Sequence, residues 1–546
     1  MNNLKKFQLS ILAIFIVFSL ILLIIGYFKI GLLSDDYLNF YDATHSTFQQ
    51  KVTGSLPFTN TLHIRPVYYL SLEKSYVIHN WLGLEYDNFA FYRIQSLVLI
   101  LLISYLTGRI LLELTGRFSL ALVSSLSVLI YPNNLNNICW TAARVDLLCC
   151  LFFVTVIFFL LRYSEKKDIL SLVVIITSFT LALFTKESSL TLPAVVVMMI
   201  YFIYGKEYLL RLKVPLIIIF LLLAVYLLFR FVFIGNSLTE IATLYQSNPL
   251  ANAPGVITRA AIGLTIPLDF LTLNRMLKLD YKIVLLYLAS LYGAVFYLIW
   301  IMIKVDIYKH IGQIASLVLV IIIPYIFVGY IRPQMILMPF VIVMIFTLWV
   351  YNHHRQFNVS INKLVLKIFY TVALVFWLFW SYQVITDWEF SYANAKENVN
   401  GLISTGLDNS KRNVLIGSMG RYKQTFLFDK MTGAYNFWKE KSFTIKDTIN
   451  DVIQTGTLDN NSIKADLEIK NLGTNEFEIK AIGKSQFFYI EGYNPDKIRT
   501  GFRNDDISVE FTEFNYLDKP IKLKLTILSE KVSCYLATES KFIKIF

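Results

Sequence analysis

Long apolar runs recur along the chain up to about residue 385 and then stop. Short polar segments separate them, and several runs approach the roughly 20 residues that a helix needs to cross a bilayer. This pattern predicts a polytopic α-helical membrane protein over residues 1–385. We expect these residues to form one transmembrane domain and the polar remainder to form another.

The apolar runs predict about eleven transmembrane helices. They cover residues 9–30, 94–114, 118–131, 147–162, 169–184, 189–204, 214–234, 284–303, 312–330, 335–351 and 364–385. A doubtful twelfth run, 257–273, contains Arg259, Gly263, Pro267 and Asp269, which favours an interfacial or re-entrant helix. With eleven spans the basic groups of the short loops fall on one side, which is then the cytoplasmic side. The C-terminal part lies outside.

The pattern changes twice beyond residue 385. Residues 386–410 predict an amphipathic helical linker, in which Trp388 can sit at the membrane interface. Residues 411–546 predict a small extracytoplasmic domain that starts as α/β and continues as mainly β. RNVLIGSM at 412–419 is typical of a buried strand, and later segments alternate with period two. We expect an antiparallel arrangement, of the sandwich type.

Composition supports a membrane protein and argues against several other classes of protein. Hydrophobic residues make up 56% and charged residues 16% of the chain, against roughly a quarter charged in soluble domains. The net charge of +12 does not indicate nucleic-acid binding, because much of it lies in loops where Lys and Arg set orientation. The four cysteines show no CxxC or paired spacing, so we expect neither a disulfide framework nor a metal cofactor.

The predicted topology gathers charged residues on the exterior face. Asp35 and Asp36 follow the first span directly, and ionisable groups at such a boundary often belong to functional sites. A solvated loop start is the alternative. The other exterior residues of this kind are Arg65, Arg144, Asp146, Lys186, Glu187 and Arg332. A single active site at the outer membrane surface would require this shared face.

Lys186 and Glu187 lie between two apolar runs with no loop to solvate them, which makes them functional-site candidates. We expect Lys186 to bind a phosphate and Glu187 to hold it in place. Arg144 and Asp146 are two residues apart and do not face each other on a helix. We therefore expect different partners for them, one being the phosphate and the other Arg65 or Lys186. A helix-start salt bridge is the alternative.

Arg65 begins the segment RPVYY at 65–69. A guanidinium group can hold a phosphate through two donors, and Tyr68 and Tyr69 could line a lipid or sugar slot. The alternative is a structural ion pair beside an aromatic interface belt. His63 could line the same site or lie at the surface. Arg332 is a further candidate phosphate ligand, unless it simply snorkels from the end of a span.

Four segments, in order, resemble motifs of the protein O-mannosyltransferase group. They are SDDY at 34–37, RPVYY at 65–69, ARVDLL at 143–148 and TKESSLTLP at 185–193. The likeness is nearest to the TMTC-like branch, whose motifs run DD, RP, GRADLL and SKE-x-x-x-T-x-P. All of these are GT-C membrane glycosyltransferases. The resemblance covers residues 1–235 through the motifs and 236–385 by pattern. It does not reach the tail, because TMTC-like members end in helical repeats.

The resemblance implies an inverting glycosyltransferase that moves a sugar from a polyprenyl-phosphate donor to an acceptor hydroxyl. It implies that the first-loop acidic pair supplies the base, with Asp35 our first choice and Asp36 orienting it, or the reverse. The residues expected to hold the donor phosphate are Arg65, Arg144, Lys186 and Arg332, supported by Asp146, Glu187, His63, Tyr68 and Tyr69.

We expect a multi-pass protein of a bacterial inner (plasma) membrane, with the polyprenyl-linked donor and membrane lipid as partners. The sequence leaves the acceptor open between protein, lipid and glycan. Two other classes also stay open. One is a flippase or transporter of lipid-linked saccharides, whose signature is mid-span charges and inverted repeats. The other is a non-catalytic envelope assembly protein.

Overall fold

The computed structural model describes most of the chain in two compact units. The described residues are 2–58, 64–233, 248–265, 308–354, 363–408 and, with short gaps, 410–546; those gaps are 423–424, 428–430, 445, 447–448, 458–466, 483–485, 491–499, 515–518 and 538–541. The first unit comprises Met1–Phe28, Ser46–Ser75 and Phe91–Ile385, and the second Lys29–His45, Tyr76–Ala90 and Thr386–Phe546. The span predicted at 284–303 and the second half of the run 257–273 lie outside the described residues.

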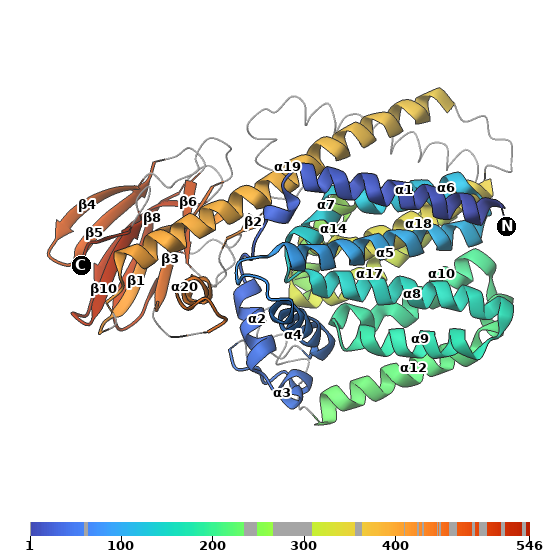
Figure 1. Cartoon of the computed structure of the whole chain (residues 1–546), viewed down its shortest axis with the longest axis horizontal. Helices are drawn as coiled ribbons and strands as arrows, with labels where there is room; N and C mark the ends of the chain where they lie inside the picture. Colours follow the sequence, from blue (N-terminus) through green and yellow to red (C-terminus); the bar gives the residue numbers. More distant parts are fainter. Residues whose placement is uncertain are drawn as a thin grey trace. The chain divides into compact units, whose positions relative to one another are not determined.

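The first unit is built of helices, among which α8, α9 and α12 run side by side (Figure 1). The helices wholly or mainly in it are α1 (Asn2–Ile24), α3 (Phe48–Thr53), α4 (Pro66–Trp81), α5 (Ala90–Thr115), α6 (Phe118–Ile130), α7 (Pro132–Cys139), α8 (Arg144–Lys166), α9 (Ile169–Leu183), α10 (Leu192–Tyr204), α11 (Lys206–Arg211), α12 (Lys213–Leu228), α14 (Pro249–Thr265), α17 (Tyr308–Val328) and α18 (Leu337–His354). Short helical turns are η2 (Glu187–Thr191), the π-helical η3 (Phe229–Phe233) and η4 (Pro333–Ile336). The turn η1 (Tyr27–Lys29) and the helix α19 (Lys363–Thr405) contribute residues to both units.

Seven of the described helices are long and apolar enough to cross a membrane, judged by length and composition, and the pair α6–α7, bent by 55°, would make eight. The shorter apolar helix α9 and the first half of α19 occupy two further predicted runs. The prediction of a polytopic helical protein with a C-terminal sheet region is therefore confirmed.

Small residues allow three helices of the first unit to approach closely. A Cβ added at Gly108 of α5 would lie 2.6 Å from the Phe7 ring of α1 and 2.2 Å from the Ser125 hydroxyl of α6. The Ser104 and Ser125 hydroxyls each donate to the other residue's carbonyl oxygen at 2.9 Å. Close packing and hydrogen bonds of this kind associate helices in lipid, where the hydrophobic effect between helices is absent.

The second unit pairs two β-sheets with two short helices. Its helices are α2 (Asp36–His45) and α20 (Met431–Glu440), and its strands are β1 (Arg412–Tyr422), β2 (Thr425–Phe426), β3 (Asp451–Thr457), β4 (Leu467–Gly473), β5 (Glu476–Ala481), β6 (Gln486–Ile490), β7 (Gly501–Arg503), β8 (Ile507–Phe514), β9 (Pro520–Ile527), β10 (Val532–Ala537) and β11 (Phe542–Lys544). One sheet has the order β11-β10-β1-β3-β6, with β2 beside β1, and the other β4-β5-β9-β8-β7. Buried residues of both sheets, including Ile416, Ile453, Ile479 and Leu523, form one core, so the unit is a sandwich.

The alternating segments beyond about residue 460 predicted antiparallel pairing, and one of the two sheets also contains parallel pairs. The sheet of β4, β5, β7, β8 and β9 is antiparallel. In the other sheet β1 runs parallel to both β3 and β10, with Val414 opposite Cys534 and Leu415 opposite Val452. Val414, Leu415 and Ile416 are all buried. A continuous apolar run of this kind is typical of a central, parallel strand, whereas alternation marks a strand with one solvated face.

The last predicted span and the first part of the predicted helical linker form one continuous helix. α19 continues for 43 residues, from Lys363 to Thr405, through the junction at 385–388. The sequence there, VITDWEF, contains neither proline nor glycine, so nothing ends the helix.

Part of the first loop packs with the C-terminal domain in the second unit. The Trp438 indole N–H of α20 donates to the Tyr37 hydroxyl of α2 at 3.1 Å, and the Tyr37 and Phe437 rings lie 5.3 Å apart. A Cβ at Gly433 would lie 2.9 Å from Leu38, so glycine permits this close approach. The segment that carries the acidic pair is therefore anchored to the tail.

Candidate functional site

Arg65 and Glu187 form an ion pair in the first unit. Arg65 directly precedes α4, and Glu187 opens η2. Nη2 and Nε of Arg65 donate to the same Glu187 oxygen, Oε2, at 2.8 and 3.2 Å. The Val67 N–H donates to the Phe184 carbonyl at 3.1 Å, which holds the two segments together. The side chains are 21% and 19% exposed, so a ligand could still reach the pair.

Lys186 pairs with Asp146 rather than with its neighbour Glu187, contrary to the expected role of Glu187. The Lys186 Nζ lies 2.5 Å from Asp146 Oδ1, and the two side chains are 7% and 10% exposed. The ammonium group also lies 5.6 Å from the ring centroid of Tyr325 on α17, a cation–π distance. The Tyr325 side chain forms a hydrogen bond with Ser188 of η2. Tyr325 thus joins the cluster, although no sequence motif pointed to it.

Arg144 contacts a different element from Asp146. It is 2% exposed, and its Nη1 donates to the Ser75 hydroxyl of α4 at 2.7 Å. The Ser75 hydroxyl donates to Gln95 Oε1 of α5 at 2.6 Å. The first turn of α8 therefore directs one charged side chain towards α4 and another towards Lys186.

Sequence reasoning missed Arg230, a third cation near Arg65 and Lys186. It lies in the π-helical turn η3 and is 3% exposed. Its Nη1 is 4.0 Å from Glu187 Oε1 and donates to the Tyr226 hydroxyl at 3.4 Å. The available signal was a single charge inside the apolar run 214–234, since an ionisable residue at membrane depth is a functional candidate by default.

We call this group the cation cluster. Its members are Arg65, Lys186 and Arg230, with the carboxylates of Asp146 and Glu187. The three cations come from the start of α4, the α9–η2 turn and η3, while Arg144 contacts α4 from the same turn of α8 as Asp146. Cations thus outnumber carboxylates within the cluster, and guanidinium and ammonium donors of this kind suit a phosphate ligand.

The other site residues predicted in the first unit lie in different environments. Tyr68 and Tyr69 are both buried, with ring centroids 5.1 Å apart. Arg332 precedes η4, and its guanidinium carbon lies 5.0 Å from the Tyr330 ring centroid. His63 lies outside the described residues.

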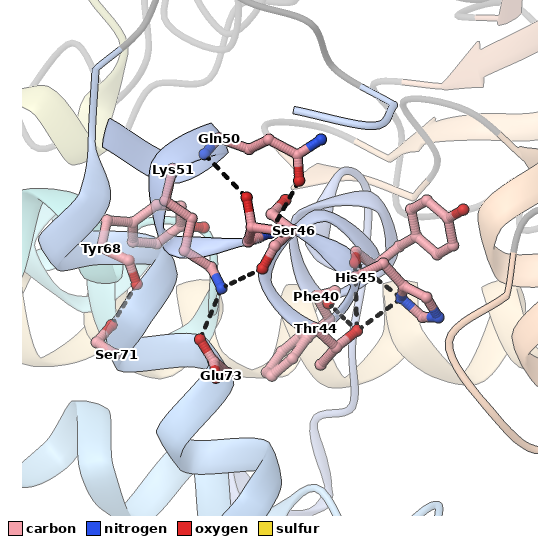
Figure 2. Close-up of polar contacts among 11 residues, drawn as sticks. Phe40, Thr44, His45, Ser46, Gln50, Lys51, Tyr68, Ser71 and Glu73 are labelled. Carbon is pink, nitrogen blue, oxygen red and sulfur yellow. Dashed lines mark hydrogen bonds and ion pairs between the residues drawn. The ribbon is translucent and has the colours of Figure 1, made fainter. Parts of the chain in front are cut away.

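A further ion pair supports the helix that follows Arg65. The Lys51 ammonium of α3 donates to Glu73 of α4 at 2.7 Å and to the Ser46 carbonyl at 2.9 Å (Figure 2). Lys51 is 2% exposed. A capping box between Thr47 and Gln50 fixes the start of α3. The pair joins α3 to α4 and so helps to hold the helix that Arg65 precedes.

The acidic pair lies in the second unit, at the start of α2. Asp35 caps the helix, since its carbonyl accepts from the Asn39 N–H at 2.9 Å. Asp36 is 1% exposed, and its Oδ2 accepts from the Leu33 N–H at 3.0 Å. Ser34 has a left-handed φ of 57°, and its N–H donates to the Leu427 carbonyl at 2.8 Å. The Asp36 carboxylate thus holds the turn, and this turn orients both acids.

Among the described residues, no group of three or more His, Cys, Asp or Glu side chains could hold a metal ion. No protein-family model matches the chain, and no curated protein matches it.

Proposed function

We propose that the chain is an inverting glycosyltransferase of the GT-C type, which moves a sugar from a polyprenyl-phosphate donor to an acceptor hydroxyl outside the membrane. The observation that carries this proposal is the cation cluster. Segments near residues 65, 186 and 230 bring three cationic side chains to one part of a helical, apolar unit. Burying so many charges is costly and needs a functional reason.

The cation cluster has the chemistry to hold the donor phosphate. In the donor this group is a phosphodiester, and it gains negative charge when the sugar leaves. Interactions that strengthen as this charge develops lower the barrier. Arg65 and Glu187 are partly exposed and suit first contact with the ligand, whereas Lys186 and Arg230 are more deeply buried. The partly exposed pair of Arg65 and Glu187 can separate, so that Arg65 donates to the phosphate oxygens.

We assign Asp35 as the base and Asp36 as the residue that orients it. The assignment is supported by the hydrogen bond from the Leu33 N–H, which commits one Asp36 oxygen to the turn. The Asp35 carboxylate takes the proton of the acceptor hydroxyl while the hydroxyl oxygen attacks the anomeric carbon. The bond from that carbon to the phosphate oxygen breaks, and its electron pair leaves with the phosphate. One displacement inverts the anomeric configuration.

The chain segments that form the second unit support the eleven-span topology. Lys29–His45 follows the first span, and Thr386–Phe546 follows the last, yet both belong to one compact unit. We infer that both lie on the same side of the membrane, which requires an even number of crossings between them. Eleven spans satisfy this condition and twelve do not. Lys5 and Lys6 before the first span favour a cytoplasmic N-terminus and an exterior second unit.

The proposal is tested with the purified full chain and synthetic polyprenyl phosphates carrying a hexose or a pentose. Envelope extract supplies the acceptor, and release of polyprenyl phosphate is measured. Arg230→Gln should lower release by about tenfold or more, the effect of a lost charged hydrogen bond. Arg109→Gln is the matched control, because Arg109 pairs with Glu113 on α5 at 2.9 Å, outside the cluster. A wild-type chain that releases no polyprenyl phosphate, or equal release by both variants, would contradict the proposal.

A further inference from the structure

The short helix α7 concentrates asparagines in the interior of the first unit. Its sequence is PNNLNNIC, and all eight residues are buried. α7 follows α6 with a bend of 55° and contacts α8 and η4. A buried amide is costly unless its hydrogen bonds are made, and the cost is greatest at membrane depth. Four asparagines on one buried turn therefore need an explanation.

Two of the asparagines have amides whose orientation is fixed by their partners. The Asn133 Nδ2 donates to the Gly263 carbonyl at 2.9 Å, and the Asn134 Nδ2 donates to the Val128 carbonyl at 3.0 Å. A carbonyl oxygen can only accept, so the atom directed away from each partner is Oδ1. Neither Oδ1 has a hydrogen-bond partner in the described structure.

Asn137 differs from these two, because neither its Oδ1 nor its Nδ2 has a hydrogen-bond partner in this part of the chain. It is 0% exposed. At about 100° per residue, Asn133, Asn134 and Asn137 lie within about 100° of arc on α7. We call these three residues the asparagine face. Thr141 follows the helix and is 1% exposed, and its Oγ1 likewise has no hydrogen-bond partner in the described structure. Buried polar groups nearly always have partners, either protein or ordered water, so this set marks a place that water or the polar groups of a ligand can fill.

The chemistry of the asparagine face indicates which partner. It is uncharged and offers three acceptor oxygens, one donor group and a nearby hydroxyl. A phosphate carries almost only acceptors and cannot satisfy amide oxygens. Sugar hydroxyls both donate and accept, and they match the set. α8, which carries Asp146 of the cation cluster, begins directly after the α7–α8 turn.

We propose that the asparagine face binds the sugar of the polyprenyl-phosphate donor, while the cation cluster binds its phosphate. This inference rests on the proposed function and adds to it a residue-level sugar subsite. It predicts that the two halves of the donor can be separated experimentally, since one set of residues senses the sugar and the other senses the phosphate.

The test uses the full-length chain in detergent and two kinds of probe. One is bare polyprenyl phosphate, and the other is polyprenyl phosphate carrying a hexose or a pentose. Asn137→Leu should weaken binding of the preferred sugar-bearing lipid by about tenfold and leave the bare lipid within about twofold. Its melting temperature should stay equal or rise, because leucine is similar in size and removes a buried amide that has no partner. Lys186→Met should weaken both lipids.

Asn352→Leu is the matched control. Asn352 is also buried, at 8% exposed, and its Oδ1 likewise has no partner in the described residues, but it lies near the C-terminal end of α18. This variant should bind both lipids as the wild type does. Equal weakening of both lipids by Asn137→Leu, or of neither, would overturn the sugar subsite alone. A lower melting temperature with unchanged lipid binding would make Asn137 structural. A wild-type chain that binds neither lipid would overturn the proposed function as well.

Discussion

The ion pair between Lys186 and Asp146 allows a structural role to be separated from phosphate binding. The two side chains are 2.5 Å apart and 7% and 10% exposed. Lys186→Met keeps most of the apolar stem and leaves the Asp146 carboxylate buried without its ammonium partner. Breaking a buried pair in this way typically costs about 3–5 kcal/mol. Because some exposure remains, we expect the lower end, about 3 kcal/mol of unfolding free energy.

The double variant Lys186→Met with Asp146→Leu removes both charges. A hydrophobic pair of similar volume is often neutral or stabilising, so the double variant should lie within about 1 kcal/mol of the wild type. The two sites should therefore couple by about 2 kcal/mol or more. The unfolding free energy is measured by titrating the full chain with a denaturing detergent in mixed micelles.

Binding gives the decisive comparison in the same experiment. If Lys186 also contacts the phosphate, the single and double variants should both bind polyprenyl phosphate more weakly, by about 1.5–3 kcal/mol, or roughly 10–150-fold. A double variant that recovers stability and also keeps wild-type affinity would show that the pair is a structural contact only. A Lys186→Met variant of unchanged stability would contradict the expected cost of breaking a buried pair.

Two further predictions concern topology and pH. A reporter fused after Thr405 should be active outside the cytoplasm and one fused after Lys167 inside it; the same sidedness at both positions would contradict the eleven-span topology. Hydrogen bonds from the Ser410 hydroxyl and backbone N–H lower the pKa of the Asp408 carboxyl. A lowered folded pKa contributes stability above the unfolded pKa, near pH 4, that is lost as pH falls through the folded value. The melting temperature of the full chain should therefore fall between about pH 5 and pH 3, and less so in Asp408→Asn; an identical fall in both would show that Asp408 contributes nothing.

Sequence patterns predicted the elements whose side chains have a regular environment. The alternating segments at 476–481 and 520–527 became β5 and β9, with alternately buried positions along β5. Such patterns report local burial and not the choice of neighbour. The parallel pairing of β1 with β3 and β10 joins strands far apart in sequence, and no local signal specifies it.

In the candidate site, too, local sequence patterns did not specify which residues become neighbours. Adjacent charges suggested that Lys186 pairs with Glu187, but successive residues of a turn point in different directions and found partners on other elements. Arg230 was overlooked because its single charge did not interrupt the apolar run around it. The packing of α2 on α20 depends on Gly433, whose role appears only when the two helices meet.

The most direct test of glycosyl transfer is mass spectrometry of cell-envelope glycans and glycoproteins from cells that carry either the wild-type gene or the Asp35→Asn allele. Asparagine keeps the size of the side chain and removes the base, so turnover should fall by roughly 10²–10⁴-fold. We expect at least one envelope species to differ by the mass of one sugar residue, present with the wild type and missing with the variant at equal protein abundance. Identical spectra from the two strains would contradict the proposed transferase.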